Sequence, residues 1–136
     1  YIGVEYDNLI EDIKSELQES IDLALSAGLS EDKIMIDPGI GFGKTIDHNL
    51  SLIKNLSRFA DLDLPILIGT SRKAFIRRIL ACHPDHEPAP RSPEVAAGTQ
   101  ATVAAAILNG AHIVRVHDVA LTVSTVKIAD ALIAAP

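Results

Sequence analysis

The stretch Lys33-Ile-Met-Ile-Asp-Pro-Gly-Ile-Gly-Phe-Gly-Lys-Thr45 decides the fold, because an apolar run ends at a carboxylate and passes straight into a glycine-rich loop. Three successive apolar residues at 34–36 predict a strand buried on both faces of a parallel sheet. Asp37 then falls at the carboxyl end of that strand, and Thr45 is placed to cap the helix that follows. In parallel α/β sheets and barrels, ligands bind at this end of the strands.

The same plan of strand, polar turn and helix occurs twice more. Residues 65–69 predict a second buried strand, which turns into a helix that we expect to open at Ser71. Residues 112–117 predict a third strand, followed by Asp118 as the cap of a last helix. An amphipathic helix over about 7–27 precedes the first strand. A proline-rich surface loop at 82–93 and an alanine-rich helix at 94–109 separate the second strand from the third.

This alternation of helices and strands predicts an α/β fold with a parallel sheet and right-handed crossovers. A complete three-layer sheet needs enough strands to shield its edges, and a (β/α)8 barrel needs eight units in roughly 250 residues. Three strands satisfy neither, and the leading helix lacks a strand before it. We therefore expect the C-terminal three βα units, plus one preceding helix, of a (β/α)8 TIM barrel. Because the chain opens at Tyr1 without methionine, we expect it to be cut from a longer chain.

Composition narrows the class of protein. The 136 residues are 48% hydrophobic with a mean hydropathy of +0.25, which suits one domain with a real core. A net charge of -6 argues against a broad nucleic-acid surface, so any basic cluster is a local site. The single cysteine, Cys82, fits a reducing compartment and reads as a core residue at a helix end. No apolar run approaches the roughly 20 residues of a membrane span, so we expect a cytoplasmic protein that binds neither nucleic acid nor membrane.

On the third predicted strand, Arg115 and His117 project to the same side because they are two apart. The arginine fork suits phosphate, so the pair predicts anion recognition; the alternative is a structural pairing of Arg115 with a carboxylate. Lys73 adds a second cation, and a helix opening at Ser71 would add free backbone N–H groups.

Asp37 accepts hydrogen bonds only, so it is suited to the ring N–H or amino groups of a ligand; the alternative is that it caps the glycine turn. Phe42 is either a loop anchor in the core or a ligand contact. The glycine run matches neither a P-loop nor a dinucleotide fingerprint, and the histidines show no metal-ligand spacing. If the strands are parallel neighbours, their ends form one mouth with a carboxylate for a flat heterocycle and cations for a phosphorylated leaving group.

Three motifs together resemble the last three strand-end motifs of dihydropteroate synthase: Asp37-Pro-Gly-Ile-Gly-Phe-Gly-Lys44, Gly69-Thr-Ser-Arg-Lys-Ala-Phe75 and Gly110-Ala-His-Ile-Val-Arg-Val-His-Asp-Val119. The resemblance implies a TIM barrel of folate biosynthesis that condenses 4-aminobenzoate with (7,8-dihydropterin-6-yl)methyl diphosphate, giving 7,8-dihydropteroate and diphosphate. It also implies a magnesium cofactor, inhibition by sulfonamides and a homodimer formed through the helix at 94–109. Residues 1–136 would then be a pterin-binding domain fragment.

The resemblance assigns the site residues by motif. It implies pterin contacts from Asp37, Lys73 and Arg115, and 4-aminobenzoate contacts from Phe42, Ser71 and Lys73. It implies that Arg115 and His117 hold the diphosphate, and that Lys73, Arg115 and His117 form the catalytic set.

The first five strands of the family barrel are not among these residues. No metal ligand is therefore expected here, magnesium being held by the N-terminal part, and the fragment is expected to be inactive alone. Its two open sheet edges are expected to pair with another copy or to be covered. Two other readings stay open: a methyltetrahydrofolate-type pterin-binding methyltransferase domain, and a non-catalytic α/β anion-binding module.

Overall fold

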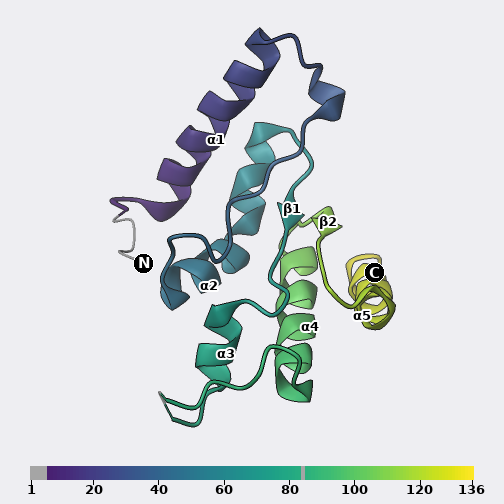
Figure 1. The fold of residues 1–136 in the computed structure, drawn as a ribbon. Coiled ribbons are helices and arrows are strands. Elements are labelled where there is room, and N and C mark those ends of the chain that lie inside the picture. Colours follow the sequence, from purple (N-terminus) through teal and green to yellow (C-terminus); the bar gives the residue numbers. More distant parts are fainter. Residues whose placement is uncertain (1–5, 84) are drawn as a thin grey trace.

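The structure, a computed structural model, describes residues 6–83 and 85–136. Its α-helices are α1 (Leu9–Ser26), α2 (Ile46–Lys54), α3 (Ala74–Leu80), α4 (Pro93–Leu108) and α5 (Val119–Ile133). Two 3-10 helices, η1 (Glu31–Lys33) and η2 (Leu56–Leu62), and two short strands, β1 (Leu67–Ile68) and β2 (Ile113–Val114), complete it. The chain is mixed α/β, as predicted, but within its described part no regular strand separates α1 from α2; β1 and β2 lie near the centre of Figure 1.

The strand segments are parallel neighbours, in chain order, but they are shorter than the sequence predicts. Ile36 forms a single parallel bridge with Ile66, and β1 pairs with β2 in the register Leu67 to Ile113. The predicted strand at 34–36 is thus reduced to a single bridge at Ile36. The predicted strands at 65–69 and 112–117 are reduced to two residues each. The segment around Ile36 and β2 are the outer segments, and each has only the middle segment, which contains β1, as a neighbour in the described chain. Regular pairing is therefore confined to the sides that face the middle segment.

The prediction that residues 34–36 are buried on both faces is wrong. Ile36 is 3% exposed, whereas Met35 is 54% exposed. Successive side chains of an extended segment point to opposite faces, and no element of the described chain covers the face that carries Met35. The apolar run is therefore buried on one face only.

Several helix ends follow the sequence closely. Gly28, with φ +90°, ends α1 in a Schellman arrangement, because its N–H donates to the Leu25 carbonyl and that of Leu29 to the Ala24 carbonyl. The Thr45 hydroxyl accepts from the His48 N–H at 3.1 Å and caps α2. The Asp118 carboxylate accepts from the Leu121 N–H at 3.0 Å and caps α5. These caps fix where the loops at the strand ends stop.

The core has two parts. The larger cluster lies among α1, α2, η2 and the strand segments, and includes the fully buried Leu52, Leu56 and Phe59. A smaller cluster of Val103, Ile107 and Ala129 joins α4 to α5 and takes in Val114 and Val116 from the third strand region. Gly98 permits the close approach of α3, since a Cβ there would lie 2.7 Å from Ile76 Cγ2.

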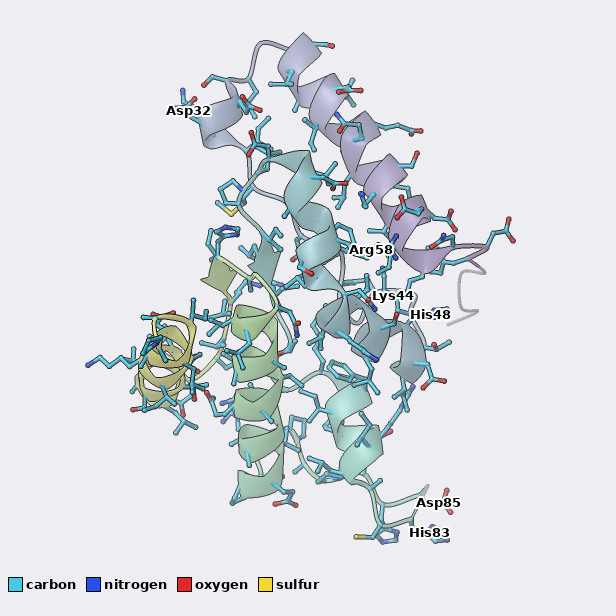
Figure 2. All side chains as sticks on the ribbon, turned by 180° about the vertical axis from the view of Figure 1, so that it is seen from behind. Asp32, Lys44, His48, Arg58, His83 and Asp85 are labelled. Atoms are coloured by element: carbon cyan, nitrogen blue, oxygen red, sulfur yellow. The ribbon has the colours of Figure 1, made fainter. Side chains whose placement is uncertain are left out.

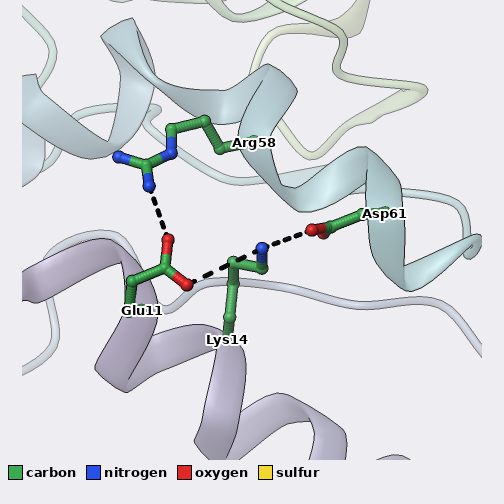
Figure 3. A network of polar contacts seen from close by, with 4 residues as sticks. All are labelled: Glu11, Lys14, Arg58 and Asp61. Carbon is green, nitrogen blue, oxygen red and sulfur yellow. Dashed lines mark hydrogen bonds and ion pairs between the residues drawn. The ribbon is translucent and has the colours of Figure 1, made fainter.

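A surface ion-pair network ties α1 to η2 (Figure 3). Glu11 and Lys14 of α1 pair with Arg58 and Asp61 of η2, respectively. Glu11, Arg58 and Asp61 are about half exposed or more, so solvent screens each pair and limits its stabilisation to roughly 1 kcal/mol or less. The helix is held mainly by the burial of Ile10, Ile13 and Ile21.

Between α3 and α4, the described residues of the proline-rich segment form a mostly exposed irregular loop, as predicted, while Pro84 lies outside the described residues. Cys82 is exposed there, so its prediction as a core residue is wrong: α3 ends at Leu80, before reaching it. None of the described helices has the length and apolar character that crossing a bilayer requires.

Candidate functional site

The glycine-rich loop carries Asp37 and Phe42 at the end of the first strand segment. Gly39, Gly41 and Gly43 have φ of +75°, +79° and +62°, the left-handed region that glycine adopts most readily. Asp37 Oδ1 accepts from the Gly39 N–H at 2.9 Å, so the carboxylate does cap the turn. The residue is nevertheless exposed, which leaves it accessible to a ligand.

The side chain of Asn49, in α2, hydrogen-bonds to the backbone of this loop. The sequence did not lead us to predict a role for this residue. Its side chain is 1% exposed, its Oδ1 accepts from the Gly41 N–H at 2.6 Å, and its Nδ2 donates to the Thr45 carbonyl at 2.6 Å. The available signal was its position: Asn49 lies on the same face of α2 as Leu52 and Ile53, which are core residues. A polar residue at such a position needs hydrogen-bond partners, and the loop provides them.

Lys73 connects the loop to the end of β1. Its Nζ donates to the Ile40 carbonyl at 2.9 Å and lies 4.0 Å from the centroid of the Phe42 ring. Phe42 is 58% exposed, so of the two expectations for this residue, the core anchor is excluded. Burial, followed by the nearby charge of Arg115, lowers the pKa of Lys73, while Asp37 acts to raise it. Lys73 therefore lies within electrostatic range of both Asp37 and Arg115.

The prediction that a helix opens at Ser71 is wrong. α3 begins at Ala74 with Lys73 as its N-cap, because Arg72 adopts a left-handed φ of +59° and the Lys73 N–H donates to the Thr70 carbonyl at 3.1 Å. Ser71 therefore offers no helix N-terminus. Its hydroxyl, in a residue 8% exposed, instead accepts from the His117 N–H at 3.3 Å and lies 2.9 Å from His117 Nδ1.

A single open pocket of about 670 Å³ gathers the residues of the second and third strand ends. Four of the predicted site residues line it: Ser71, Lys73, Arg115 and His117. Arg115 lies against Gly69, where an added Cβ would come within 3.4 Å of its Nε. Val114 and Val116 pack toward α4 and α5, as the predicted alternation requires. Asp37 and Phe42 are not among the lining residues and adjoin the pocket through Lys73.

Two further cations, Arg72 and Arg91, line the pocket and were not predicted. The sequence could have indicated Arg72, because it stands between two predicted site residues. Nothing in the sequence indicated that Arg91, in the proline-rich loop, would reach the pocket. Four cationic side chains thus line one pocket in a chain of net charge -6, so the pocket is locally positive and its chemistry suits an anion. No carboxylate forms an ion pair with Arg115 within residues 6–83 and 85–136, so the structural pairing considered for it is not seen.

The described residues do not fit a magnesium centre. Nowhere in that part of the chain do three His, Cys, Asp or Glu side chains gather to bind a metal, and one oxygen of Asp37 is engaged by Gly39. His83 and Asp85 pair at 3.6 Å, at the tip of the loop beyond α3 and away from the strand ends (Figure 2).

The sequence matches the family described as "Pterin binding enzyme" over residues 2–117. The chain belongs to this family. Among the pterin-binding enzymes similar to it is a dihydropteroate synthase of Bacillus subtilis, 43% identical over 94% of this chain and 42% of that protein. A dihydropteroate synthase of Escherichia coli is 36% identical over 96% of this chain and 44% of that protein. The chain thus spans less than half the length of these curated relatives.

Solved structures of pterin-binding enzymes share the fold. The Yersinia pestis dihydropteroate synthase in a sulfonamide drug complex superposes with a TM-score of 0.87 at 36% identity, covering 97% of this chain and 45% of that one. The Xanthomonas albilineans dihydropteroate synthase in complex with 7,8-dihydropteroate gives a TM-score of 0.87 at 35% identity, covering 97% of this chain and 49% of that one.

Proposed function

We propose that this chain is the C-terminal part of a dihydropteroate synthase, contributing three βα units and one preceding helix to a TIM barrel. The proposal rests above all on one observation: Ser71, Lys73, Arg115 and His117 line one pocket, and Lys73 links that pocket to Asp37 and Phe42. The reaction would join 4-aminobenzoate to (7,8-dihydropterin-6-yl)methyl diphosphate. The dihydropteroate bound to the Xanthomonas relative is the product of that reaction, which supports the proposal.

The pterin would lie where Asp37, Lys73 and Arg115 interact. An ionised Asp37 has only acceptor oxygens, which suits the ring N–H and amino groups of a pterin. The guanidinium of Arg115 is planar and can lie against the flat ring while its edge reaches an anion. Lys73 would contact the same ring from the loop side, after exchanging its bond to the Ile40 carbonyl for one to the ligand.

Catalysis would consist of stabilising a leaving anion. The C–O bond to the diphosphate breaks, its electron pair leaves with the diphosphate, and the aryl amine then attacks the methylene carbon and loses a proton. Arg115 and His117 would hold the diphosphate, with Lys73 adding a third donor beside it. Preorganised donors of this kind stabilise charge where it develops.

The 4-aminobenzoate would lie between the glycine loop and the β1 turn. Phe42 offers an exposed ring beside Lys73, and Ser71 offers a hydroxyl already fixed by His117. Since Ser71 is not at a helix N-terminus, its hydroxyl and the cations of the pocket would receive the carboxylate.

The remaining proposals concern the whole protein. The described residues fit no magnesium site, so the ligands of a magnesium cofactor would lie outside them. We propose that these 136 residues alone do not catalyse the reaction, that the whole protein is a cytoplasmic homodimer, and that residues 1–136 form a pterin-binding domain fragment. The coverage of 42% of the Bacillus subtilis relative supports the fragment proposal.

Calorimetry on the purified chain tests the function. We expect (7,8-dihydropterin-6-yl)methyl diphosphate to bind at least about tenfold more tightly than 6-hydroxymethyl-7,8-dihydropterin, since charge-assisted bonds to the diphosphate each contribute roughly 1.5–3 kcal/mol. Arg115→Ala should abolish that preference. Arg78→Ala, which removes an arginine paired with Glu87 outside the pocket, should keep it.

A second arm tests turnover. The chain combined with the N-terminal half of the Bacillus subtilis relative should form dihydropteroate, and the Arg115→Ala combination should not. Equal affinity for both pterins would favour a methyltransferase-type pterin domain. Binding of neither pterin would favour an anion-binding module.

A further inference from the structure

The turn that carries Ser71 and Lys73 contains a strained residue. Arg72 has φ +59°, a left-handed conformation that disfavours residues other than glycine, asparagine and aspartate. Such positions persist only where surrounding contacts over-determine the backbone, and they cluster at ligand sites. The strain here lies between two residues that line the anion pocket.

Two threonines of α4 supply the holding contacts. Thr99, 3% exposed, accepts the Arg72 N–H on its Oγ1 at 3.2 Å. Thr102 lies on the same face, with its Oγ1 2.9 Å from Thr70 Oγ1 and 2.8 Å from the Thr99 carbonyl. α4 thus makes hydrogen bonds to the turn at two residues, Thr70 and Arg72, which stand on either side of Ser71.

We propose that Thr99 and Thr102 are positioning residues of the anion site. They touch no ligand; they keep Arg72 in its left-handed conformation, so that Ser71 meets His117 and Lys73 meets Phe42 across the strand ends. Without the Thr99 hydroxyl, the Arg72 N–H loses its acceptor and the turn is free to relax toward a right-handed conformation. The Ser71–His117 contact would then open. As a statement about catalysis, this inference rests on the proposed function.

The test compares substitutions that alter only the hydroxyl. Thr99→Val keeps the packed volume and removes the acceptor, whereas Thr99→Ser keeps the acceptor. Thr125→Val is the matched control: it removes a hydroxyl that donates to Gln100 Oε1 at 2.7 Å between α5 and α4, away from the turn. Affinity for inorganic pyrophosphate is measured by calorimetry on each purified chain, with the melting temperature alongside. Dihydropteroate formation is measured in the complemented protein.

We expect Thr99→Val to weaken pyrophosphate binding and to lower kcat/KM by about tenfold, while Thr99→Ser and Thr125→Val stay within about twofold of wild type. If Thr99→Val does not fold, Thr102→Val, at a half-buried position, carries the same expectation. Wild-type affinity in the valine variants, or a loss that Thr99→Ser does not restore, overturns the inference.

The two proposals fail separately. If the wild-type chain binds pyrophosphate but its complemented protein forms no dihydropteroate, the proposed function fails, and the threonine comparison still decides the positioning role. Absence of pyrophosphate binding by the wild-type chain overturns both.

Discussion

At the scale of single residues, Lys73 is the predicted site residue whose pKa the structure shifts. Burial lowers its pKa first, Arg115 lowers it further, and Asp37 acts in the opposite direction. Because the folded pKa lies below the ordinary value of 10.5, the unfolded state binds more protons between the lowered pKa and 10.5. Lys73 therefore makes the protein more stable as the pH rises through that window.

A charge substitution separates these causes. We expect Arg115→Gln to raise the pKa of Lys73, because the like charge that disfavours its protonated form is removed. The measurement is an NMR titration of the Lys73 side-chain carbon next to Nζ.

Arg91→Gln is the control for this titration. Arg91 lines the same pocket but is not among the causes that shift Lys73, so its substitution should leave the titration midpoint unchanged. An unchanged or lower pKa in Arg115→Gln would contradict the placement of the two cations beside each other.

At the scale of elements, the conformation of the glycine loop depends on α2, through the side chain of Asn49. We expect Asn49→Ala to lower the free energy of unfolding by about 2–4 kcal/mol, because it leaves the Gly41 N–H without its partner and removes a buried amide that also bonds the Thr45 carbonyl. Denaturant unfolding followed by circular dichroism gives the value.

Asn55→Ala provides the comparison within the same segment. Asn55 is only half buried, and its amide donates to the Ser51 carbonyl one turn back, so we expect a loss of about 1 kcal/mol or less. Equal losses at both positions would mean that the bonds from Asn49 to the loop add no special stability.

At this scale, the sequence predicted those helix ends and strand faces that are determined by residues close together in the chain. The Thr45 and Asp118 caps, the Gly28 turn and the alternation around Arg115 are set within a few residues, and all are confirmed. The helix start near Ser71 was misplaced because Thr99, far along the chain, holds Arg72 in a left-handed turn. Arg91 was missed because only the tertiary placement of the proline-rich loop brings it to the pocket. Asn49 differs, since its partners Gly41 and Thr45 lie within eight residues and its place on the buried face of α2 was a usable signal.

For the molecule as a whole, apolar side chains remain uncovered on two sides. α1 and α5 lie on opposite sides of the strands (Figure 1). α5 buries only Thr122 and Ala129 and exposes Val119, Ile128, Leu132 and Ile133 by more than half. Leu23 of α1, and Met35 of the first strand segment, are also more than half exposed. Ile128 and Leu132 are one helical turn apart and so are neighbours on one face of α5, and an exposed apolar face of this kind is typical of surfaces that other protein covers.

We therefore expect the purified chain to self-associate as its concentration rises, and α5 to contribute to the contact. Ile128→Lys combined with Leu132→Lys should shift sedimentation toward the monomer, because charged side chains would have to be desolvated in the contact. The melting temperature at low concentration should change by only a few degrees, since both side chains are 60–65% exposed. Ser20→Lys combined with Ser26→Lys adds the same charge on α1 and should leave association through α5 intact. A wild-type chain that stays monomeric at all concentrations would show that these faces do not associate by themselves.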